Sequence, residues 1–336
     1  MSHSREAARP DSVWAVVTPV FEDGASFAAL CRDLARVDAS VTLEILAVDD
    51  GSIGSPPAID AMREAGLAGR IVRLKRNCGH QTAAWVGLTV AAADPRHDGA
   101  VVMDSDGEDR PEDIPRLIAA VGPDCDAAAA RRGRRRESLS FRLFYRIYRL
   151  FFGLMTGREI RSGNFCALGR RALLRLTAMQ ETRIHLAAAL IKSRLRRAEI
   201  PCDRGARYSG RSQMNFYDLA LHGLRAVAVF DDAVLTRMGA VCAWAAASGV
   251  AIFLVGLALK LAGQTTPGWL TFVTGFLVLV FLQTAILSLV ALIMNALGYR
   301  SPADLEAAAV SLILETETAP GNPDTGDPAP DDPSDA

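Results

Sequence analysis

The chain has 336 residues, of which half are hydrophobic and 22% are charged, and its formal net charge is −1. This hydrophobic content excludes a largely disordered chain, and the length allows one sizeable folded domain together with a hydrophobic segment. Although the net charge is near zero, positive and negative residues are concentrated in different parts of the chain. Arginines are frequent in residues 131–161 and 194–211, whereas the segment from Glu315 to Ala336 is acidic.

The N-terminal residues 1–12 are polar, so we expect a flexible leader and no cleaved secretory signal. The six cysteines are scattered along the chain without short paired spacings. This pattern argues against a zinc site or a disulfide framework and favours reduced thiols.

Strands and helices alternate over the next hundred residues. Short apolar runs predict strands at 14–20, 43–48, 71–74 and 99–103. Helical spacing of apolar residues, or alanine-rich composition, predicts helices at 25–37, 58–65 and 81–93. The alternation predicts an α/β fold with a mostly parallel sheet and helices on both faces.

Polar residues follow three of these strands directly. They are Thr18-Pro19, Asp49-Asp50 and Asp104-Ser105-Asp106. In open α/β sheets, ligands bind in the crevice at the carboxyl ends of the strands. We therefore expect these three segments to converge on one crevice.

The pattern changes after Val121. Residues 138–155 predict an amphipathic helix with arginines among aromatics, 165–168 a further strand, 170–179 a helix and 213–230 a helix leading towards a membrane. We place the folded domain at 13–212 and juxtamembrane amphipathic helices at 213–238.

Two uncharged hydrophobic stretches follow, within residues 239–261 and 269–297. Each reaches the roughly 20 residues that cross a bilayer core as a helix. The short loop between them predicts a transmembrane hairpin with both long flanks on one side. The arginine-rich segments lie on that side, which the positive-inside rule assigns to the cytoplasm. Residues 298–336 predict an amphipathic segment and an acidic tail that is disordered after Thr316.

Three carboxylates stand at alternate positions beyond the fourth strand: Asp104, Asp106 and Glu108. Crowded carboxylates repel one another, and hard oxygen ligands suit Mg²⁺ or Mn²⁺. The plainer interpretation is a polar loop that caps the next helix, near Pro111 and Glu112. The second acidic strand end, at Asp49-Asp50, favours the metal site.

The chain resembles the family 2 glycosyltransferases in a series of ordered motifs. They are Thr18-Pro19-Val20, Asp49-Asp50-Gly51-Ser52, Arg76-Asn77-Cys78-Gly79-His80-Gln81, and Asp104-Ser105-Asp106-Gly107-Glu108 with Pro111-Glu112. The resemblance covers residues 13–297 and implies the GT-A fold. The hairpin is similar to that of the branch that glycosylates polyprenyl phosphates, which includes dolichyl-phosphate mannose synthases and bacterial undecaprenyl-phosphate glucosyltransferases.

The resemblance also implies roles for matching residues. Those assigned to the nucleotide sugar are Pro19, Val20 and Glu22 at the base and ribose, Asp50 at the nucleoside, and Asn77, Gly79 and His80 along the donor. Asp104 and Asp106 would organise the diphosphate with the metal. Glu108 stands where this branch often has Gln, although a carboxylate is a competent ligand. For His80, capping or packing at a helix start is the alternative.

The arginine-rich segments suit a lipid phosphate, since arginine binds phosphate through a planar fork of donors. By resemblance, Arg131 and Arg134, and more weakly Arg142, would hold the acceptor phosphate. Arg207 and Ser212 would close over the diphosphate from an R-x-x-G-x-S loop, for which a flexible basic loop is the alternative. An attraction to anionic lipid or to nucleic acid would also use arginines. The hairpin argues against nucleic acid.

Asn164 stands near the position where many relatives have an acidic residue. An amide cannot act as a base, but a phosphate monoester has a second pKa near 6 and is already largely ionised at neutral pH. The residue therefore favours a phosphate acceptor over a sugar hydroxyl.

Taken together, these features predict a glycosyltransferase of the inner membrane. It would move a sugar from a nucleotide sugar, UDP-linked, to a polyprenyl phosphate with inversion. Transfer to a glycolipid or saccharide remains an alternative, as does a non-catalytic membrane subunit that binds sugar nucleotides. A homo-oligomer stays open.

Overall fold

A computed structural model describes residues 12–38, 40–132, 139–160, 163–209, 216–264, 268–297 and 301–320. The chain forms two compact units. The sheet unit comprises Met1–Arg142, Ile160–Val229 and Arg300–Ala336, and the hairpin unit comprises Leu143–Glu159 and Phe230–Tyr299. Two stretches therefore fall differently from the predicted boundaries. Residues 143–159 belong with the hairpin, and the described residues 301–320 belong with the sheet.

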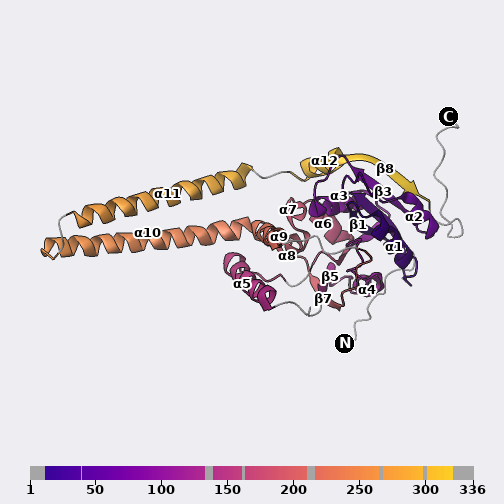
Figure 1. The fold of residues 1–336 in the computed structure, drawn as a ribbon, viewed down its shortest axis with the longest axis horizontal. Coiled ribbons are helices and arrows are strands. Elements are labelled where there is room, and N and C mark those ends of the chain that lie inside the picture. The colour runs from indigo at the N-terminus through magenta and orange to yellow at the C-terminus, as the bar shows by residue number, and fades with distance from the viewer. Residues whose placement is uncertain are drawn as a thin grey trace. The chain divides into compact units, whose positions relative to one another are not determined.

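The sheet unit contains an eight-stranded sheet in the order β7-β5-β6-β4-β1-β2-β3-β8 (Figure 1). Its strands are β1 (Val13–Val20), β2 (Thr42–Asp49), β3 (Gly69–Leu74), β4 (His97–Val102), β5 (Ala127–Arg132), β6 (Cys166–Gly169), β7 (Arg197–Cys202) and β8 (Ile313–Ala319). Strand β1 pairs in parallel with β2 and β4, β2 with β3, and β5 with β7. Strands β6 and β8 pair antiparallel with their neighbours. The α/β fold with a mostly parallel sheet is confirmed.

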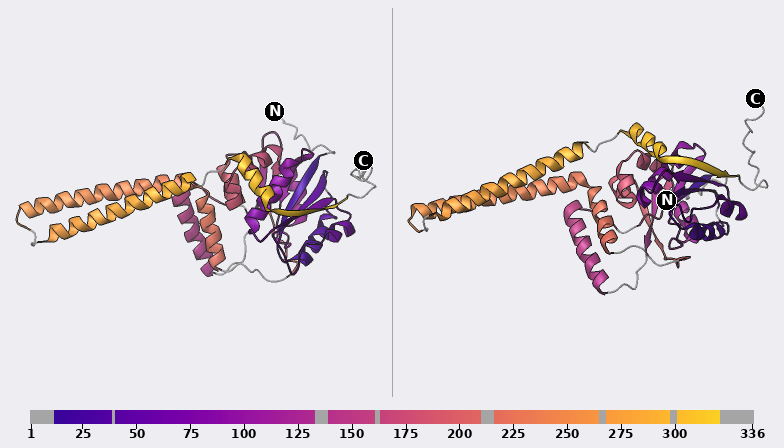
Figure 2. Two further views of the ribbon diagram at one scale, coloured as in Figure 1. Left: turned by 90° about the horizontal axis from the view of Figure 1, so that it is seen from above. Right: turned by 45° about the horizontal axis from the view of Figure 1, so that its top comes forward.

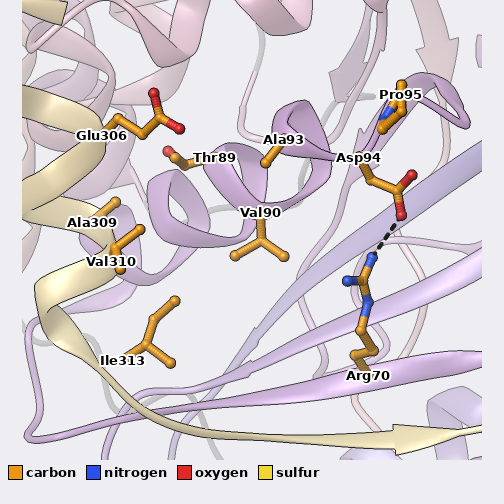
Figure 3. A pocket seen from close by; sticks show the side chains of 10 residues that line it. All are labelled: Arg70, Thr89, Val90, Ala93, Asp94, Pro95, Glu306, Ala309, Val310 and Ile313. Atoms are coloured by element: carbon orange, nitrogen blue, oxygen red, sulfur yellow. Dashed lines mark hydrogen bonds and ion pairs between the residues drawn. The ribbon is translucent and has the colours of Figure 1, made fainter. Parts of the chain in front are cut away.

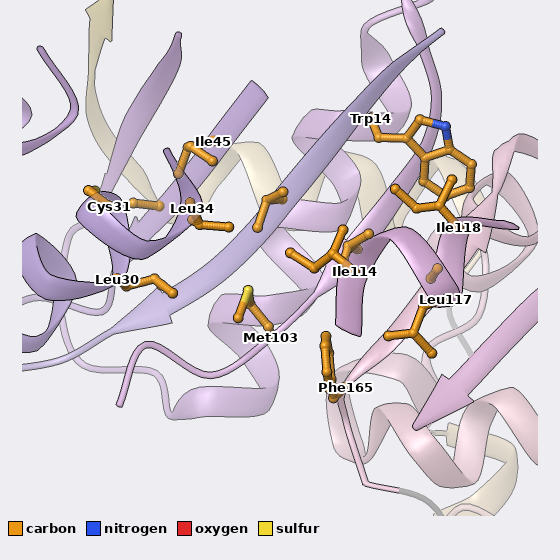
Figure 4. Packing of buried hydrophobic residues seen from close by; sticks show 14 of the residues in the cluster. Trp14, Leu30, Cys31, Leu34, Ile45, Met103, Ile114, Leu117, Ile118 and Phe165 are labelled. Atoms are coloured by element: carbon orange, nitrogen blue, oxygen red, sulfur yellow. The ribbon is translucent and has the colours of Figure 1, made fainter. Parts of the chain in front are cut away.

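Helices cover both faces of this sheet. One face carries α1 (Gly24–Leu34), α2 (Ile59–Glu64) and α4 (Ile114–Ala119), the last preceded by a 3-10 turn at Pro111–Asp113. Their side chains, among them Leu30 and Leu117, pack on Ile45 and Met103 of the sheet side (Figure 4). The other face carries α3 (His80–Ala93), α6 (Arg170–Thr177) and α8 (Leu186–Lys192). The short α7 (Glu181–Ile184) precedes α8, and α9 (Phe216–Ala228) ends this part of the unit.

The central strands agree with the predicted ones to within two residues because each contains a short buried apolar run, which is longest in β1. Strands β5 and β7 were not predicted. Strand β5 reads Ala-Ala-Ala-Ala-Arg-Arg and lacks β-branched residues, whereas β7 reads Arg-Ala-Glu-Ile-Pro-Cys and contains Pro201. Their pairing with each other and with β6 overrides these weak local preferences.

The C-terminal region corrects a prediction. Disorder was expected from Thr316, but α12 (Pro302–Leu312) leads into β8, which continues to Ala319 and closes the sheet edge beside β3. Ser301 and Asp304 form a capping box at the start of α12. Leu305 and Ala309 of α12 are buried against Trp85 of α3 and Val72 of β3. The rest of the predicted tail, residues 321–336, lies outside the described residues, as does the predicted leader up to residue 11.

The hairpin unit consists of two long helices and most of a third. Helices α10 (Asp231–Leu261) and α11 (Trp269–Leu297) run side by side (Figure 2). Both are long and apolar enough to cross a membrane, and almost none of their apolar surface is buried. The sequence predicted that a juxtamembrane helix ends at residue 238 and a membrane helix begins at 239. Instead, α10 begins at Asp231 and continues through residue 239 without a break.

Helix α5 (Leu139–Thr156) contributes its residues from Leu143 onwards to the hairpin unit. The ring of Phe152 packs edge-on against Phe230, with 5.8 Å between centroids. The guanidinium of Arg237 on α10 donates to the carbonyls of Gly153 and Leu154. A cation at these last carbonyls stabilises the end of α5.

Candidate active site

Three strand ends lie side by side at one edge of the sheet. Val20 pairs with Asp49, and Val17 pairs with Val102, so the carboxyl ends of β1, β2 and β4 are neighbours. The backbone N–H of Asp50 donates to the carbonyl of Val20 at 2.8 Å. The register therefore brings Asp49-Asp50 and the segment after β4 to one edge of the sheet, whereas Thr18 and Pro19 lie within β1 and are buried.

The Asp49-Asp50-Gly51-Ser52 segment forms a tight turn after β2. The Asp49 carboxylate accepts the N–H of Ser52 at 2.9 Å. Gly51 has φ +76°, and a side chain there would meet the backbone of Arg76 at 2.6 Å. Only glycine fits this turn, because the backbone is left-handed and its neighbour is a rigid main chain.

The carboxylate of Asp50 holds the loop that starts α3. It accepts the N–H groups of Cys78 and Gly79 at 2.6 and 2.8 Å, and its side chain is buried. Burial raises the pKa of the Asp50 carboxyl above its ordinary value. The hydrogen bonds from the two N–H groups lower this pKa but do not offset the effect of burial. The predicted contact of Asp50 with a nucleoside would use an oxygen that this loop already engages.

The carboxylate of Glu22 likewise holds a loop, that of residues 53–55 after β2. This carboxylate accepts N–H groups of Ile53, Gly54 and Ser55 at 2.7 to 3.1 Å, and these bonds hold the pKa of Glu22 below its ordinary value. Pro19 and Val20, predicted with it along the base and ribose, are buried in β1, and Val20 belongs to the core.

His80 is the first residue of α3, and its side chain reaches two other residues of the site. Its Nε2 lies 3.3 Å from Oδ1 of Asp104 and 3.2 Å from Nδ2 of Asn164. Asn77 accepts the N–H of Gly79, the residue that precedes the helix. His80 is thus both a helix-start residue and a bridge between the end of β4 and the start of β6.

The three predicted metal ligands follow β4 within six residues. The Asp106 carboxylate accepts the N–H of Glu108 at 2.9 Å and pairs with Arg207 Nη2 at 2.8 Å. Glu108 pairs with Arg207 Nε at 3.1 Å and with Arg204. Arg207 was predicted here, whereas Arg204 was not singled out from the arginine-rich segment. Its spacing of three residues from Arg207 was the available signal.

The segment 204–209 is fastened over the Asp106–Glu108 turn. Gly205 N–H donates to the carbonyl of Glu108, and Tyr208 N–H donates to that of Asp106, both at 2.9 Å. A side chain at Gly107 would lie 2.8 Å from the Tyr208 ring. The Tyr208 hydroxyl donates to Asp33 on α1 at 2.7 Å. These contacts bring both arginines to the carboxylates.

The side chains at residues 104, 106 and 108 are all carboxylates, the ligand type that suits a hard divalent ion, but one oxygen of each is not gathered within 4.8 Å of the others. Among the described residues, ligand atoms gather in this way at Glu44, Asp94 and His97, which lie at the opposite end of β2 and β4. The guanidinium groups of Arg70 and Arg96 pair with the carboxylates of this group. Arginines therefore pair with carboxylates at both places, since Arg204 and Arg207 pair with Glu108 and Asp106, and an ion at the turn after β4 stays a prediction.

A cavity of about 390 Å³ lies at this opposite end, between the end of α3 and α12 (Figure 3). Its lining is mainly apolar, from Val90, Ala309 and Ile313, with Arg70 and Asp94 at one side. Asp94 precedes β4 and Asp104 follows it, so the cavity is separate from the candidate active site.

The predicted acceptor residues are described only in part. Arg131 lies exposed near the end of β5, and Arg142 lies in α5. Arg134 and Ser212 lie outside the described residues. The structure therefore connects Asp50, the loop before α3, His80 and Asp104 by contacts, and the roles assigned to the donor-side and acceptor-side residues stay predictions.

Comparisons with known proteins agree with the motifs. Two relatives, from Salmonella choleraesuis (strain SC-B67) and Salmonella newport (strain SL254), are each named undecaprenyl-phosphate 4-deoxy-4-formamido-L-arabinose transferase. Each is 29% identical over 220 residues, 63% of this chain and 65% of the relative. The match thus spans slightly less than two thirds of these relatives' length.

Solved structures give weaker similarities. Glucosyl-3-phosphoglycerate synthase from Mycobacterium tuberculosis, in complex with Mn²⁺ and UDP-glucose, has a TM-score of 0.47 at 16% identity, covering 68% of this chain and 79% of that one. Mannosyl-3-phosphoglycerate synthase from Rubrobacter xylanophilus has a TM-score of 0.44 at 15% identity, covering 76% and 78%.

The family model described as glycosyl transferase family 2 matches residues 15–182. This match covers half of the chain and includes β1 to β6, α3 and every carboxylate of the candidate site. The chain belongs to glycosyl transferase family 2.

Proposed function

We propose that the protein is a membrane-attached glycosyltransferase that moves a sugar from a nucleotide sugar, UDP-linked, to a polyprenyl phosphate. The observation that carries the proposal is the link between two acidic turns, which follow β2 and β4 on either side of β1. Asp50 holds the loop before His80, and His80 contacts Asp104 of the carboxylate turn. Family membership and the printed activity of the Salmonella relatives support the same reaction class.

Mg²⁺ or Mn²⁺ would be held by Asp104, Asp106 and Glu108. Such an ion would neutralise the diphosphate that leaves with the nucleoside. Arg204 and Arg207 add two positive charges at the same turn, which favours an anionic ligand there. The residues of the site would thus mainly position the donor and stabilise its leaving group.

The acceptor side supports a phosphate nucleophile. Asn164 lies within 3.2 Å of His80, close to the carboxylate turn, and its amide cannot remove a proton. A phosphate acceptor needs no such base at neutral pH. We assign its binding to Arg131 and Arg134. The acceptor oxygen would attack the anomeric carbon and the nucleoside diphosphate would leave, with inversion.

The exposed surfaces of α10 and α11 support a membrane location. Their large apolar side chains, such as Trp244, Phe272 and Phe281, are exposed in the chain alone. A soluble protein rarely leaves such a long apolar surface in water, whereas a bilayer core covers it. We propose that both helices span the inner membrane and that the sheet unit faces the cytoplasm.

A paired acceptor experiment tests the proposal. Purified protein is incubated with a panel of UDP-sugars and either undecaprenyl phosphate or undecaprenol, and the release of UDP is measured. We expect UDP release with the phosphate, loss of release with EDTA, and none with undecaprenol. Release that requires undecaprenol, or a saccharide without lipid phosphate, would contradict a phosphate acceptor. Binding of UDP-sugars without any turnover would indicate a non-catalytic subunit.

A further inference from the structure

Strand β8 brings two glutamates beside the nucleotide side of the sheet. In the sheet register, Arg73 of β3 pairs with Asp49 of β2 on one side and with Glu315 of β8 on the other. Residues paired across neighbouring strands lie on the same face. Glu317 is two residues further along β8, so it lies on that face as well.

Arg73 joins the two sides through its guanidinium. It donates to Asp49 Oδ2 and to Glu317 Oε1, both at 2.8 Å, and its Nε lies 3.3 Å from Glu315 Oε1. The side chain of Asp49 is only 3% exposed, whereas those of Glu315 and Glu317 are 57% and 36% exposed. Because the guanidinium is a rigid planar fork, contacts on one edge fix the direction of the other.

Asp49 in turn shapes the loop after β2. Its second oxygen accepts the N–H of Ser52, and the Ser52 hydroxyl accepts the N–H of Glu22 at 2.8 Å. The Glu22 carboxylate then binds the N–H groups of residues 53–55. Contacts therefore run without interruption from β8 to the whole loop 49–55.

We propose that β8 is a positioning element for nucleotide binding: Glu315 and Glu317 orient Arg73, and Arg73 keeps Asp49 in the geometry that shapes loop 49–55. This role of β8 depends on the proposed glycosyltransferase function only in that the bound ligand is taken to be a nucleotide sugar. According to this proposal, β8, which follows the two apolar helices α10 and α11, raises the affinity for the donor although its residues do not contact the donor.

The test compares the full-length protein in detergent with the Glu315→Gln/Glu317→Gln variant. Hydrogen–deuterium exchange of residues 50–55 should become faster, since the Ser52 N–H is held less firmly. The Kd for UDP in the presence of Mn²⁺, measured by calorimetry, should rise about twofold to fivefold, the range of partly exposed ion pairs. The matched control is Glu306→Gln on α12, a carboxylate of the same C-terminal segment that lines the separate cavity.

A second variant strengthens the test. Arg73→Gln leaves the buried Asp49 carboxylate without this partner, so exchange and Kd should change more than in the double glutamine variant. Thermal melting confirms that each variant is folded. Exchange of residues 50–55 that equals wild type in the folded glutamine variant would overturn the proposal. Absence of UDP binding by the wild-type protein would instead refute the proposed function, and the exchange measurement would still decide the role of β8.

Discussion

The Nε2 atom of His80 lies 3.3 Å from Oδ1 of Asp104, so the first residue of α3 contacts the first carboxylate after β4. The two residues come from segments that bind to different parts of the donor in the proposed reaction. Asp50 fixes the backbone just before His80. In the proposed site, the contact would therefore link the residues assigned to the nucleoside with those assigned to the metal.

Replacement of His80 by alanine should weaken metal use. A residue that orients a metal-binding carboxylate typically affects metal affinity or activity by about 10- to 100-fold. We expect the Mn²⁺ concentration for half-maximal transfer to rise by about tenfold in His80→Ala. The comparison variant is Asn164→Ala, which removes the other neighbour of His80 and should change this concentration less. Equal metal dependence in His80→Ala and wild type would show that the contact has no role in metal binding.

Removal of Arg204 should make the carboxylate turn more receptive to a cation. Its guanidinium pairs with Glu108, which is buried, and competes there with a divalent ion. In Arg204→Gln, Mn²⁺ without nucleotide should raise the melting temperature more than it does in wild type. Arg197→Gln, on strand β7, serves as the control. A smaller Mn²⁺ effect in Arg204→Gln would indicate that the arginine assists the ion.

Asp50→Asn should loosen the loop before α3. An amide can accept a hydrogen bond through one atom only, whereas the carboxylate accepts two N–H groups. An unsatisfied buried N–H costs about 1–3 kcal/mol, so we expect a loss of stability in this range together with weaker UDP binding. Asp60→Asn on α2, an exposed carboxylate paired with Arg63, should leave both properties near wild type. Unchanged UDP affinity in Asp50→Asn would argue against the role of this loop.

Acid should destabilise the sheet unit through His185. Burial, followed by the neighbouring His222, lowers the pKa of His185 from 6.5 to about 3. Between pH 6.5 and 3 the unfolded chain binds a proton at His185 that the folded chain does not, so stability falls as the pH falls. The slope reaches at most one proton, about 1.4 kcal/mol per pH unit. His185→Gln should flatten the stability profile between pH 6 and 4.5, measured by urea unfolding, and an unchanged slope would contradict this assignment.

The arrangement of the acidic strand ends was predictable because it depends on short-range rules. Apolar runs that end in Asp49-Asp50 and Asp104 define strand ends, and parallel strands bring such ends to one edge. The contacts of Arg204 with Glu108 and of Arg73 with β8 were not predictable in the same way. They join segments more than 90 residues apart, and the acidic composition of β8 resembles that of the tail that follows it. A strand at a sheet edge gains its stability from pairing with β3, which the local sequence does not record.

The most direct test of the account is the mass of the lipid product formed by purified protein from undecaprenyl phosphate and a UDP-sugar. The account predicts undecaprenyl phosphate heavier by one sugar residue in wild type with Mg²⁺ or Mn²⁺. It predicts no such product with EDTA or in Asp106→Asn. A glycosylated lipid that forms equally well in Asp106→Asn, or without any divalent ion, would contradict it.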